Sequence, residues 1–492
     1  MTTTWLTFGL YFVVLLALGI VAWQRTQNLS DYILGGRRLG SGVTALSAGA
    51  SDMSGWLLLG LPGYAYLAGL EAGWIALGLF IGTWLNWKLV ASRLRTATQQ
   101  LDDSLTLPDY FQRRFADTSG LLRIIPAAFI LIFFALYVSA GLVAGGRLFE
   151  TVFEMPYLWA VSAGAAAIIL YTFLGGYLAV SWTDALQAML MLIALVAVVL
   201  MVLGDADTNL FGAVAEHNRE LLNPFTDATG QALSVMAIVS LMAWGLGYFG
   251  QPHILARFMG IRAASELVRA RQIAIGWVAI CLIAAVLVGI AGIGGLAVTL
   301  EAEAAETVFI RLVEVLFHPV IAGICLAAIL AAIMSTADSQ LLVASSVVSE
   351  DFYKGWFRPD AGQHELVWVG RSAVIAIALI AFGLAADPER MVLDLVAHAW
   401  AGLGAAFGPV ILMSLYWRRM SRAGAAAGML AGGLTVLIWH RLDGGLFEVY
   451  EILPGAILAA LAATIGSLAL PDRRATERFE TMLVSPTRAT ES

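Results

Sequence analysis

The sequence predicts an all-α integral membrane protein with thirteen transmembrane helices. Hydrophobic residues make up 60% of the 492 residues and charged residues only 13%, about half the charged share of a soluble domain. The apolar residues gather in runs of about 20 residues, the length that an α-helix needs to cross a bilayer. Basic residues cluster in every second connection between these runs, which is typical of a membrane protein with a fixed orientation.

The first apolar run is interpreted as a membrane helix rather than a cleaved signal peptide, because it is long enough to span and no basic segment precedes it. The connections are too short to fold separately, so residues 1–470 are expected to form a single membrane domain. The expected spans are 4–23, 43–68, 70–91, 122–146, 157–178, 186–203, 232–254, 274–298, 319–347, 372–386, 393–416, 424–440 and 452–470.

The basic residues predict an outside amino terminus and a cytoplasmic carboxyl terminus. With that orientation all but five of the 28 Lys and Arg residues lie on the cytoplasmic side, including the cluster from Arg257 to Arg271, as the positive-inside rule requires. Residues 471–492 are expected to be a mobile cytoplasmic tail. The five basic residues on the outer side are Arg147, Arg219, Arg311, Arg390 and Arg441.

Two expected spans are interrupted by glycine-rich segments, SAGASDMSGWLLLGLPG at 47–63 and AWGLGYFGQPHI at 243–254. Glycine weakens a helix, and unwound backbone within a membrane is tolerated where it faces a cavity or a ligand. Freed carbonyls suit an alkali cation and freed N–H groups suit a carboxylate. The alternative is that the glycines permit close helix packing.

The spacing of the two interruptions predicts an internal repeat. The second to sixth spans (about 43–203) and the seventh to eleventh (about 232–416) would form two five-helix repeats. Their orientations would be opposite because each contains an odd number of helices. Interrupted helices at matching positions of inverted repeats are typical of a transporter binding site.

Asp52 lies inside the first interruption. Burying an ionised carboxylate in a membrane costs at least about 2.5–3.5 kcal/mol, so Asp52 is expected to have a partner or a task. It can ligate a cation itself or orient the groups that do. Asp184 and Asp338 are further carboxylates in apolar spans, although Asp184 can equally be an interfacial helix cap.

Hydroxyl groups gather on one face of the span 319–347. Positions i, i+3, i+4 and i+7 share a helical face, and hydroxyl oxygens can ligate a monovalent ion without adding charge. Hydrogen bonding between helices is an equally good explanation for hydroxyls in isolation. The residues on this face are Ala332, Ser335, Thr336 and Ser339.

Aromatic residues flank both interruptions and offer flat walls for a small apolar or ring-shaped group. Each alone is more often a packing residue or an interfacial anchor. Pro252 and His253 close the second interruption, and His253 is interpreted as a structural hydrogen-bonding residue, with a proton relay as the alternative. The aromatic residues are Trp56, Tyr137, Trp244 and Tyr248.

Enzyme motifs are missing from the sequence: it contains no H-E-x-x-H, Walker A, G-x-S-x-G or paired-cysteine motif. Cys281 and Cys325 lie in apolar runs and indicate neither a disulfide nor a metal site. A hydrolase would need Asp52 and Asp184 side by side, and a channel would need a repeated filter motif; the sequence indicates neither. The net charge of −7 does not support nucleic-acid binding.

Several segments are similar to the proline-transporting branch of the solute:sodium symporter family. They are SAGASDMSGW, GGYLAVSWTDALQAMLM, GYFGQPHILARFM, AAIMSTADSQLLVASS and HAWAGLGAAFGPVILMSLYW, and the similarity extends over about residues 8–470. The resemblance implies a LeuT-like fold and sodium-coupled uptake of L-proline by alternating access across the bacterial inner membrane. The alternative is a sodium- or proton-coupled symporter of another small amino acid or carboxylate. The resemblance implies Na⁺ as the co-transported ion, and it implies no enzymatic activity, nucleic-acid ligand or obligatory protein partner.

The resemblance also implies roles for particular residues. Sodium would be held by the carbonyls of Ala50, Met53 and Ala332 and the hydroxyls of Ser335 and Thr336. The important residues of the first interruption would be Asp52, Ser54 and Gly55. Substrate would contact Trp56, Tyr137, Trp244 and Tyr248, with Pro252 nearby. Arg37 corresponds to a sensitive cytoplasmic arginine. A second sodium site of some relatives corresponds to Asp184, Asp338 and Ser339, which leaves one or two sodium ions per substrate open.

Overall fold

The computed structural model describes residues 2–23, 29–174, 176–204, 210–302, 304–387 and 390–483. These residues form helices and connecting turns, with two isolated bridges and no strand. Ten of the described helical segments are long and apolar enough to cross a membrane by length and composition. The predicted class, an all-α membrane protein, is therefore confirmed.

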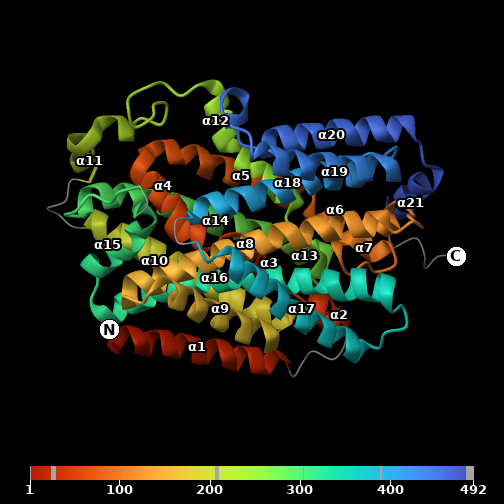
Figure 1. The fold of residues 1–492 in the computed structure, drawn as a ribbon, viewed down its shortest axis with the longest axis horizontal. Helices are drawn as coiled ribbons and strands as arrows, with labels where there is room; N and C mark the ends of the chain where they lie inside the picture. Colours follow the sequence, from red (N-terminus) through yellow and green to blue (C-terminus); the bar gives the residue numbers. More distant parts are fainter. Residues whose placement is uncertain are drawn as a thin grey trace.

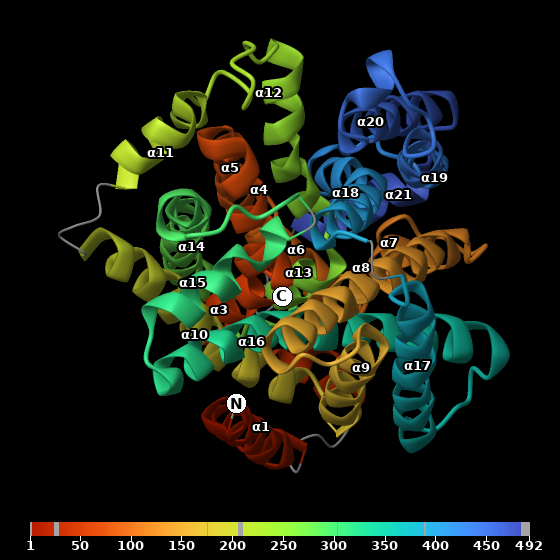
Figure 2. The ribbon, with the colours of Figure 1, turned by 60° about the vertical axis from the view of Figure 1, so that its left-hand side comes forward.

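The long helices lie roughly side by side along the horizontal of Figure 1. Figure 2 shows α3, α13 and α16 near the middle of the molecule, with α1, α11, α17 and α20 around them. The long helices are α1 (Thr2–Trp23), α5 (Gly73–Leu89), α8 (Leu121–Phe153), α9 (Tyr157–Leu174), α10 (Tyr177–Gly204), α14 (Leu267–Gly295), α16 (Pro319–Ser346), α17 (Gln363–Leu384), α18 (Val392–Tyr416), α19 (Arg422–Trp439) and α20 (Ile452–Ala469).

Shorter helices form the ends and connections of these long helices. They are α2 (Leu29–Leu34), η1 (Gly35–Arg37), η3 (Gly69–Ala72), α6 (Ala91–Gln100), α7 (Leu107–Arg114), α11 (Leu210–Asn218), η4 (Arg219–Leu222), η6 (Ala264–Glu266), η7 (Ala305–Thr307), α15 (Val308–Leu316), η8 (Val347–Phe357), η9 (Gly445–Glu448) and α21 (Arg473–Leu483).

Both glycine-rich segments interrupt their helices. The first span consists of α3 (Ser41–Asp52), the π-helical turn η2 (Trp56–Gly60) and α4 (Leu61–Ala68), and the backbone leaves the helix at Met53 with φ −89° and ψ 84°. The second consists of α12 (Val235–Met242), the 3₁₀ segment η5 (Ala243–Gly250) and α13 (Pro252–Gly260). Proline at the first position of α13 starts the new helix without a missing hydrogen bond.

Glycine also allows the second interruption to approach its neighbour. A Cβ added to Gly82 of α5 would lie 2.1 Å from the carbonyl oxygen of Gly245 in η5. Any larger residue at Gly82 would therefore push η5 away. The close contact fixes the position of the residues that follow Gly245 in the chain.

Helix α21 lies in the segment for which the sequence predicts a mobile tail. Ala475, Phe479 and Met482 share one face and are buried. Arg114 of α7 holds this face by donating from Nη1 to the Ala475 carbonyl at 2.7 Å and by lying 4.9 Å from the Phe479 ring centroid. The amphipathic spacing explains why this part of the tail packs. Residues 484–492 lie outside the described residues.

The turn between α7 and α8 is held by Asp117. Its carboxylate accepts hydrogen bonds from the Ser119 hydroxyl at 2.6 Å and from the backbone N–H of Leu122 at 2.9 Å. Burial raises the pKa of Asp117, but these hydrogen bonds and the nearby Arg422 outweigh burial and hold the pKa below its usual range. The ionised form therefore stabilises the start of α8.

Candidate functional site

The predicted sodium ligands meet where α3 ends beside α16. The Ser335 hydroxyl donates to the Ala50 carbonyl at 2.9 Å, and the Thr336 hydroxyl donates to the same carbonyl at 3.3 Å. Ser335 Oγ is also 3.0 Å from the Ala332 carbonyl oxygen. All four residues are buried. Met53, the fifth predicted ligand, is the residue at which the backbone leaves α3.

We call Ala50, Met53, Ala332, Ser335 and Thr336 the ion group. It has the chemistry of a site for a hard monovalent cation. Its oxygens belong to carbonyls and hydroxyls, which carry no net charge and are typical ligands of alkali ions. Each hydroxyl can rotate so that a lone pair, rather than its proton, points toward an ion. Because Ala50 belongs to α3 and Ser335 and Thr336 to α16, a bound ion would connect the two helices.

Asp52 is the centre of the second group, two residues further along the same interruption. The hydroxyl of Tyr248 donates to Asp52 Oδ2. The Trp56 indole N–H and the Tyr137 hydroxyl approach the Asp52 carbonyl oxygen at 3.2 and 3.4 Å. Three of the four predicted aromatic residues, from η2, α8 and η5, therefore converge on one residue. Asp52 Oδ1 is buried and has no hydrogen-bond partner within the described part of the chain.

The fourth aromatic residue, Trp244, lies beside these three. We call Trp56, Tyr137, Trp244 and Tyr248 together the aromatic wall. The ring centroid of Trp244 lies 6.4 Å from that of Trp56. Trp400 of α18, which sequence reasoning did not select, supports the wall from behind: its indole N–H donates to the Trp244 carbonyl at 2.7 Å, and its ring meets Tyr248 edge-on at 5.1 Å. The side chains of Trp56, Tyr137, Trp244 and Tyr248 are all at most 7% exposed.

Gly55 and Pro252 have structural positions near these groups. A Cβ added to Gly55 would lie 2.8 Å from Ala144 Cβ and 3.2 Å from Ile333 Cγ1, so the interruption fits closely between α8 and α16. The Ser54 hydroxyl accepts a long hydrogen bond, 3.5 Å, from the Trp56 backbone N–H. Pro252 starts α13 and lines a different, small cavity on the side of α2 and α7.

His253 packs among aromatic rings beside the same site. Its ring meets Phe134 at 5.5 Å and Tyr137 at 6.2 Å, both edge-on. The side chain is fully buried. Neither ring nitrogen has a hydrogen-bond partner among the described residues. The position therefore fits a packing residue that supports Tyr137, and not the hydrogen-bonding residue expected from the sequence.

The residues predicted for a second cation lie together around Arg257. Asp184 Oδ2 accepts from the Ser47 hydroxyl at 2.7 Å, from the Ser51 hydroxyl at 3.1 Å and from Arg257 Nη2 at 3.0 Å. Arg257 Nη2 also donates to the hydroxyl of Ser339 in α16. The positive charge at this place therefore belongs to the protein itself.

Arg257 corrects one expectation from the sequence. The sequence places it in a cytoplasmic basic cluster, but its side chain is fully buried. It lies one turn after His253, whose carbonyl it contacts at 3.1 Å. Asp338 stands at the edge of this group, 3.4 Å from the Ser339 hydroxyl. In the sequence, Arg257 cannot be distinguished from the exposed arginines that follow it, because the clustering of charges carries no information on burial.

Arg37 lies apart from both groups, where η1 precedes α3. It donates to Asp103 Oδ1 at 2.8 Å, to the Ser104 carbonyl at 2.9 Å and to the Met259 carbonyl at 2.6 Å. Three segments, η1, the turn after α6 and the end of α13, are therefore held together by one guanidinium. Arg37 itself has φ +53°, a left-handed conformation that this set of bonds maintains.

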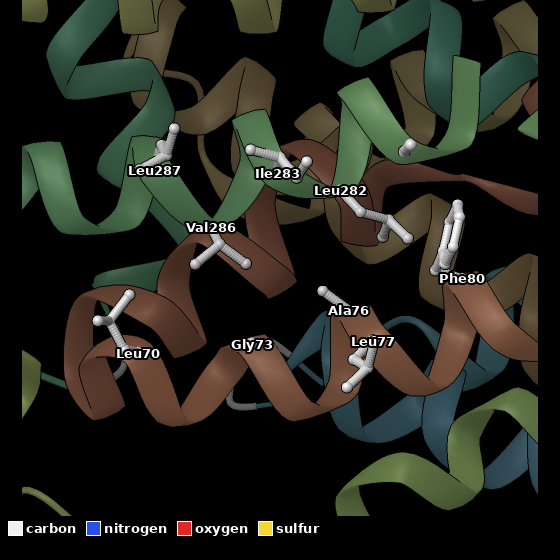
Figure 3. Close-up of a pocket in the computed structure, with 10 residues that line it drawn as sticks. Leu70, Gly73, Ala76, Leu77, Phe80, Leu282, Ile283, Val286 and Leu287 are labelled. Carbon is white, nitrogen blue, oxygen red and sulfur yellow. The ribbon is translucent and has the colours of Figure 1, made fainter. Parts of the chain in front are cut away.

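A hollow between α5 and α14 is not the binding site for a polar solute. Figure 3 shows its lining, which includes Leu70, Leu77, Phe80, Ile283 and Val286. It has a volume of about 390 Å³ and all of its lining residues are apolar or glycine. Without charged or hydrogen-bonding side chains it cannot compensate the desolvation of a zwitterion.

Comparison with known proteins identifies the family. Residues 32–432 match the sodium:solute symporter family. The chain is 53% identical to a sodium/proline symporter of Escherichia coli (strain K12), over 94% of this chain and 92% of the relative. It is 47% identical to the osmoregulated proline transporter OpuE of Bacillus subtilis (strain 168), over 94% of each.

The fold is similar to that of a solved Na⁺-coupled sialic acid symporter in a substrate-bound, outward-open state. The TM-score is 0.78 at 17% identity, covering 96% of this chain and 99% of the other. This likeness shows a membrane transporter fold. The chain is a member of the sodium:solute symporter family, and therefore a transporter rather than an enzyme.

Proposed function

We propose that this protein couples sodium influx to the uptake of L-proline across the inner membrane of a bacterium. The relatives that cover nearly the whole chain are proline transporters by name. One observation supports coupling most directly: the carbonyl of Ala50, in the ion group, and Asp52, in the aromatic group, are two residues apart in one interrupted helix. An ion that fixes the backbone of this segment would also fix Asp52 and, through it, the aromatic wall.

The proposed topology has thirteen spans, an outside amino terminus and a cytoplasmic carboxyl terminus. Ten long apolar segments and two shorter ones among the described residues make twelve. One of the ten, Trp56–Gln100, contains both the second half of the first interrupted span and α5, so it counts as two spans and gives thirteen. The distribution of Lys and Arg supports the orientation. Interruptions in the second and seventh spans support two inverted repeats of five helices.

The substrate carboxylate would be received by N–H groups freed where α3 gives way to η2, as at other helix starts that bind anions. Its ring would lie against Trp56, Tyr137, Trp244 and Tyr248. Asp52 would keep this geometry by holding Tyr248 through its side chain and two further aromatic residues through its carbonyl. Gly55 keeps the backbone close enough to α8 and α16 for these contacts to form.

Sodium would bind between α3 and α16 and favour the state that binds proline. By linkage, proline then raises the affinity for sodium by the same factor. Arg257 supplies a positive charge 3.0 Å from Asp184, which favours one sodium ion per proline. One charge that moves down 100 mV provides about 2.3 kcal/mol, or about fiftyfold accumulation of a neutral zwitterion.

Arg37 would act at the cytoplasmic end of the pathway. Its bonds join the start of the first interrupted span to the end of α13, which follows the second interruption. Release to the cytoplasm would require these two segments to separate. Arg37 is therefore expected to form a latch that closes the cytoplasmic side.

Uptake of labelled proline into proteoliposomes tests this function. We expect an inward sodium gradient to drive uptake and a proton gradient alone to fail. Excess unlabelled proline should compete better than a panel of other amino acids and carboxylates. Ser335→Ala combined with Thr336→Ala should abolish the sodium dependence. Ser345→Ala with Ser346→Ala is the matched control, because these α16 hydroxyls bond to Leu342 in their own helix.

A further inference from the structure

Three side chains with metal-binding chemistry meet where α18, α19 and α20 come together. His398 lies near the start of α18, His440 directly follows α19, and Glu451 directly precedes α20. His398 Nδ1 is 2.9 Å from Glu451 Oε1, and His440 Nδ1 is 3.5 Å from the same oxygen. One ligand atom from each residue lies within 4.8 Å of the others.

The spacing fits a tetrahedral metal ion. Ligand atoms about 2.05 Å from a tetrahedral zinc ion lie about 3.3 Å apart, which falls between the two observed separations. Two imidazoles and one carboxylate form a common zinc ligand set, with the fourth position left for water. Imidazole ligands select transition metals over Mg²⁺ and Ca²⁺, which prefer oxygen.

The three residues are accessible to an ion from solution. The His440 side chain is 53% exposed, and those of His398 and Glu451 are each 14% exposed. The two histidine rings are stacked with centroids 4.0 Å apart, so both present the same edge to Glu451. In the proposed topology this end of α18 faces the outside of the cell.

The group is connected to the aromatic wall by its immediate chain neighbours. Tyr450, next to Glu451, stacks on Trp244 at 5.3 Å and donates to the carbonyl of Ala397, next to His398, at 2.7 Å. Half a turn after His398, Trp400 donates to the Trp244 carbonyl. An ion held by all three ligands would therefore fix α18 against α19 and α20. It would also fix Trp400 and Tyr450, two residues that contact Trp244.

We propose that His398, His440 and Glu451 bind one Zn²⁺ ion at the outer end of α18 and that the bound ion slows transport. Binding does not depend on the proposed substrate. The effect on uptake rests on the proposed function, since it requires α18 to shift relative to α19 and α20 during the transport cycle.

Calorimetric titration of ZnCl₂ into the purified full-length protein, after chelator treatment, tests the binding. We expect one ion per chain, and about tenfold or greater loss of affinity in both His440→Ala and Glu451→Gln. The matched control is His217→Ala, because His217 is exposed and lies in α11. Binding that is unchanged in both ligand variants, or no binding by the wild type, would overturn the site.

Proline uptake with and without external Zn²⁺ tests the effect, with each variant compared to its own metal-free rate. Zn²⁺ should slow the wild type and His217→Ala reversibly, with recovery on adding EDTA, and leave His440→Ala unaffected. Equal inhibition of His440→Ala would refute the link between this site and transport. A protein that binds one Zn²⁺ but fails to take up proline would contradict the proposed function and leave the metal site standing.

Discussion

Replacing Arg257 with glutamine should destabilise the protein and create a need for a second cation. The side chains of Arg257 and Asp184 are both fully buried and 3.0 Å apart, and removing one partner of a buried pair typically costs about 3–5 kcal/mol. Coulomb's law gives a similar size, about 4 kcal/mol for charges 4 Å apart at an effective dielectric constant of 20. Dividing this loss of free energy by the entropy of unfolding expected for a chain of this length predicts a melting temperature lower by about 3–5 °C.

Thermal melting of the purified protein in detergent measures this change. The melting temperature of Arg257→Gln should fall at low sodium and recover partly as sodium is raised, because an ion can then neutralise Asp184. The double variant Arg257→Gln with Asp184→Asn should melt above the single variant, since it removes both members of the buried ion pair. Arg262→Gln is the control: its side chain is 66% exposed, and exposed ion pairs contribute about 0–1 kcal/mol.

Sodium dependence of uptake gives a second measure of the same substitution. The Hill coefficient for sodium should be near 1 in the wild type and rise above 1 in Arg257→Gln. A melting temperature of Arg257→Gln equal to that of the wild type at every sodium concentration would refute the argument. It would show that Arg257 does not compensate a buried carboxylate.

Three further substitutions test separate parts of the site. Tyr248→Phe removes the hydroxyl that donates to Asp52. Leaving a buried carboxyl oxygen without this partner costs about 1–3 kcal/mol, which should weaken proline binding about 5- to 150-fold in an equilibrium binding assay. Gly55→Ala places a methyl group 2.8 Å from Ala144 Cβ, which should cost about 1–3 kcal/mol and reduce uptake; adding Ala144→Gly should restore part of it, and failure of that rescue would count against the steric explanation. Asp117→Asn should lower the melting temperature at neutral pH, because the pKa of Asp117 is held below its usual range; the difference from the wild type should stay constant above about pH 5 and shrink only as the pH falls below about 4.

Much of the fold follows from patterns along the chain. Runs of apolar residues locate the helices, since in a membrane the length of a span is fixed by the bilayer. The interruptions follow from glycine in apolar surroundings, and the backbone leaves the helix at Met53, within the first of them. The spacing of Ser335 and Thr336 puts both on one face, and the structure places that face against Ala50.

Other features depend on contacts between distant segments and have no local signal. Arg257 resembles its exposed neighbours in sequence, and only the packing of α13 against α3 and α16 buries it. Trp400 supports the aromatic wall from α18, but the residues around it in that helix are mostly alanine and glycine and give no sign of this role. His398, His440 and Glu451 come from three helix ends, so their proximity appears only in three dimensions.

The central claim is that the ion group and the substrate group share one interrupted helix. Equilibrium binding of labelled proline to the purified protein, measured as sodium is varied, tests this claim most directly. Sodium should raise the affinity of the wild type for proline. In Ser335→Ala with Thr336→Ala, proline binding should persist but no longer respond to sodium. An undiminished sodium response in that double variant would contradict the account.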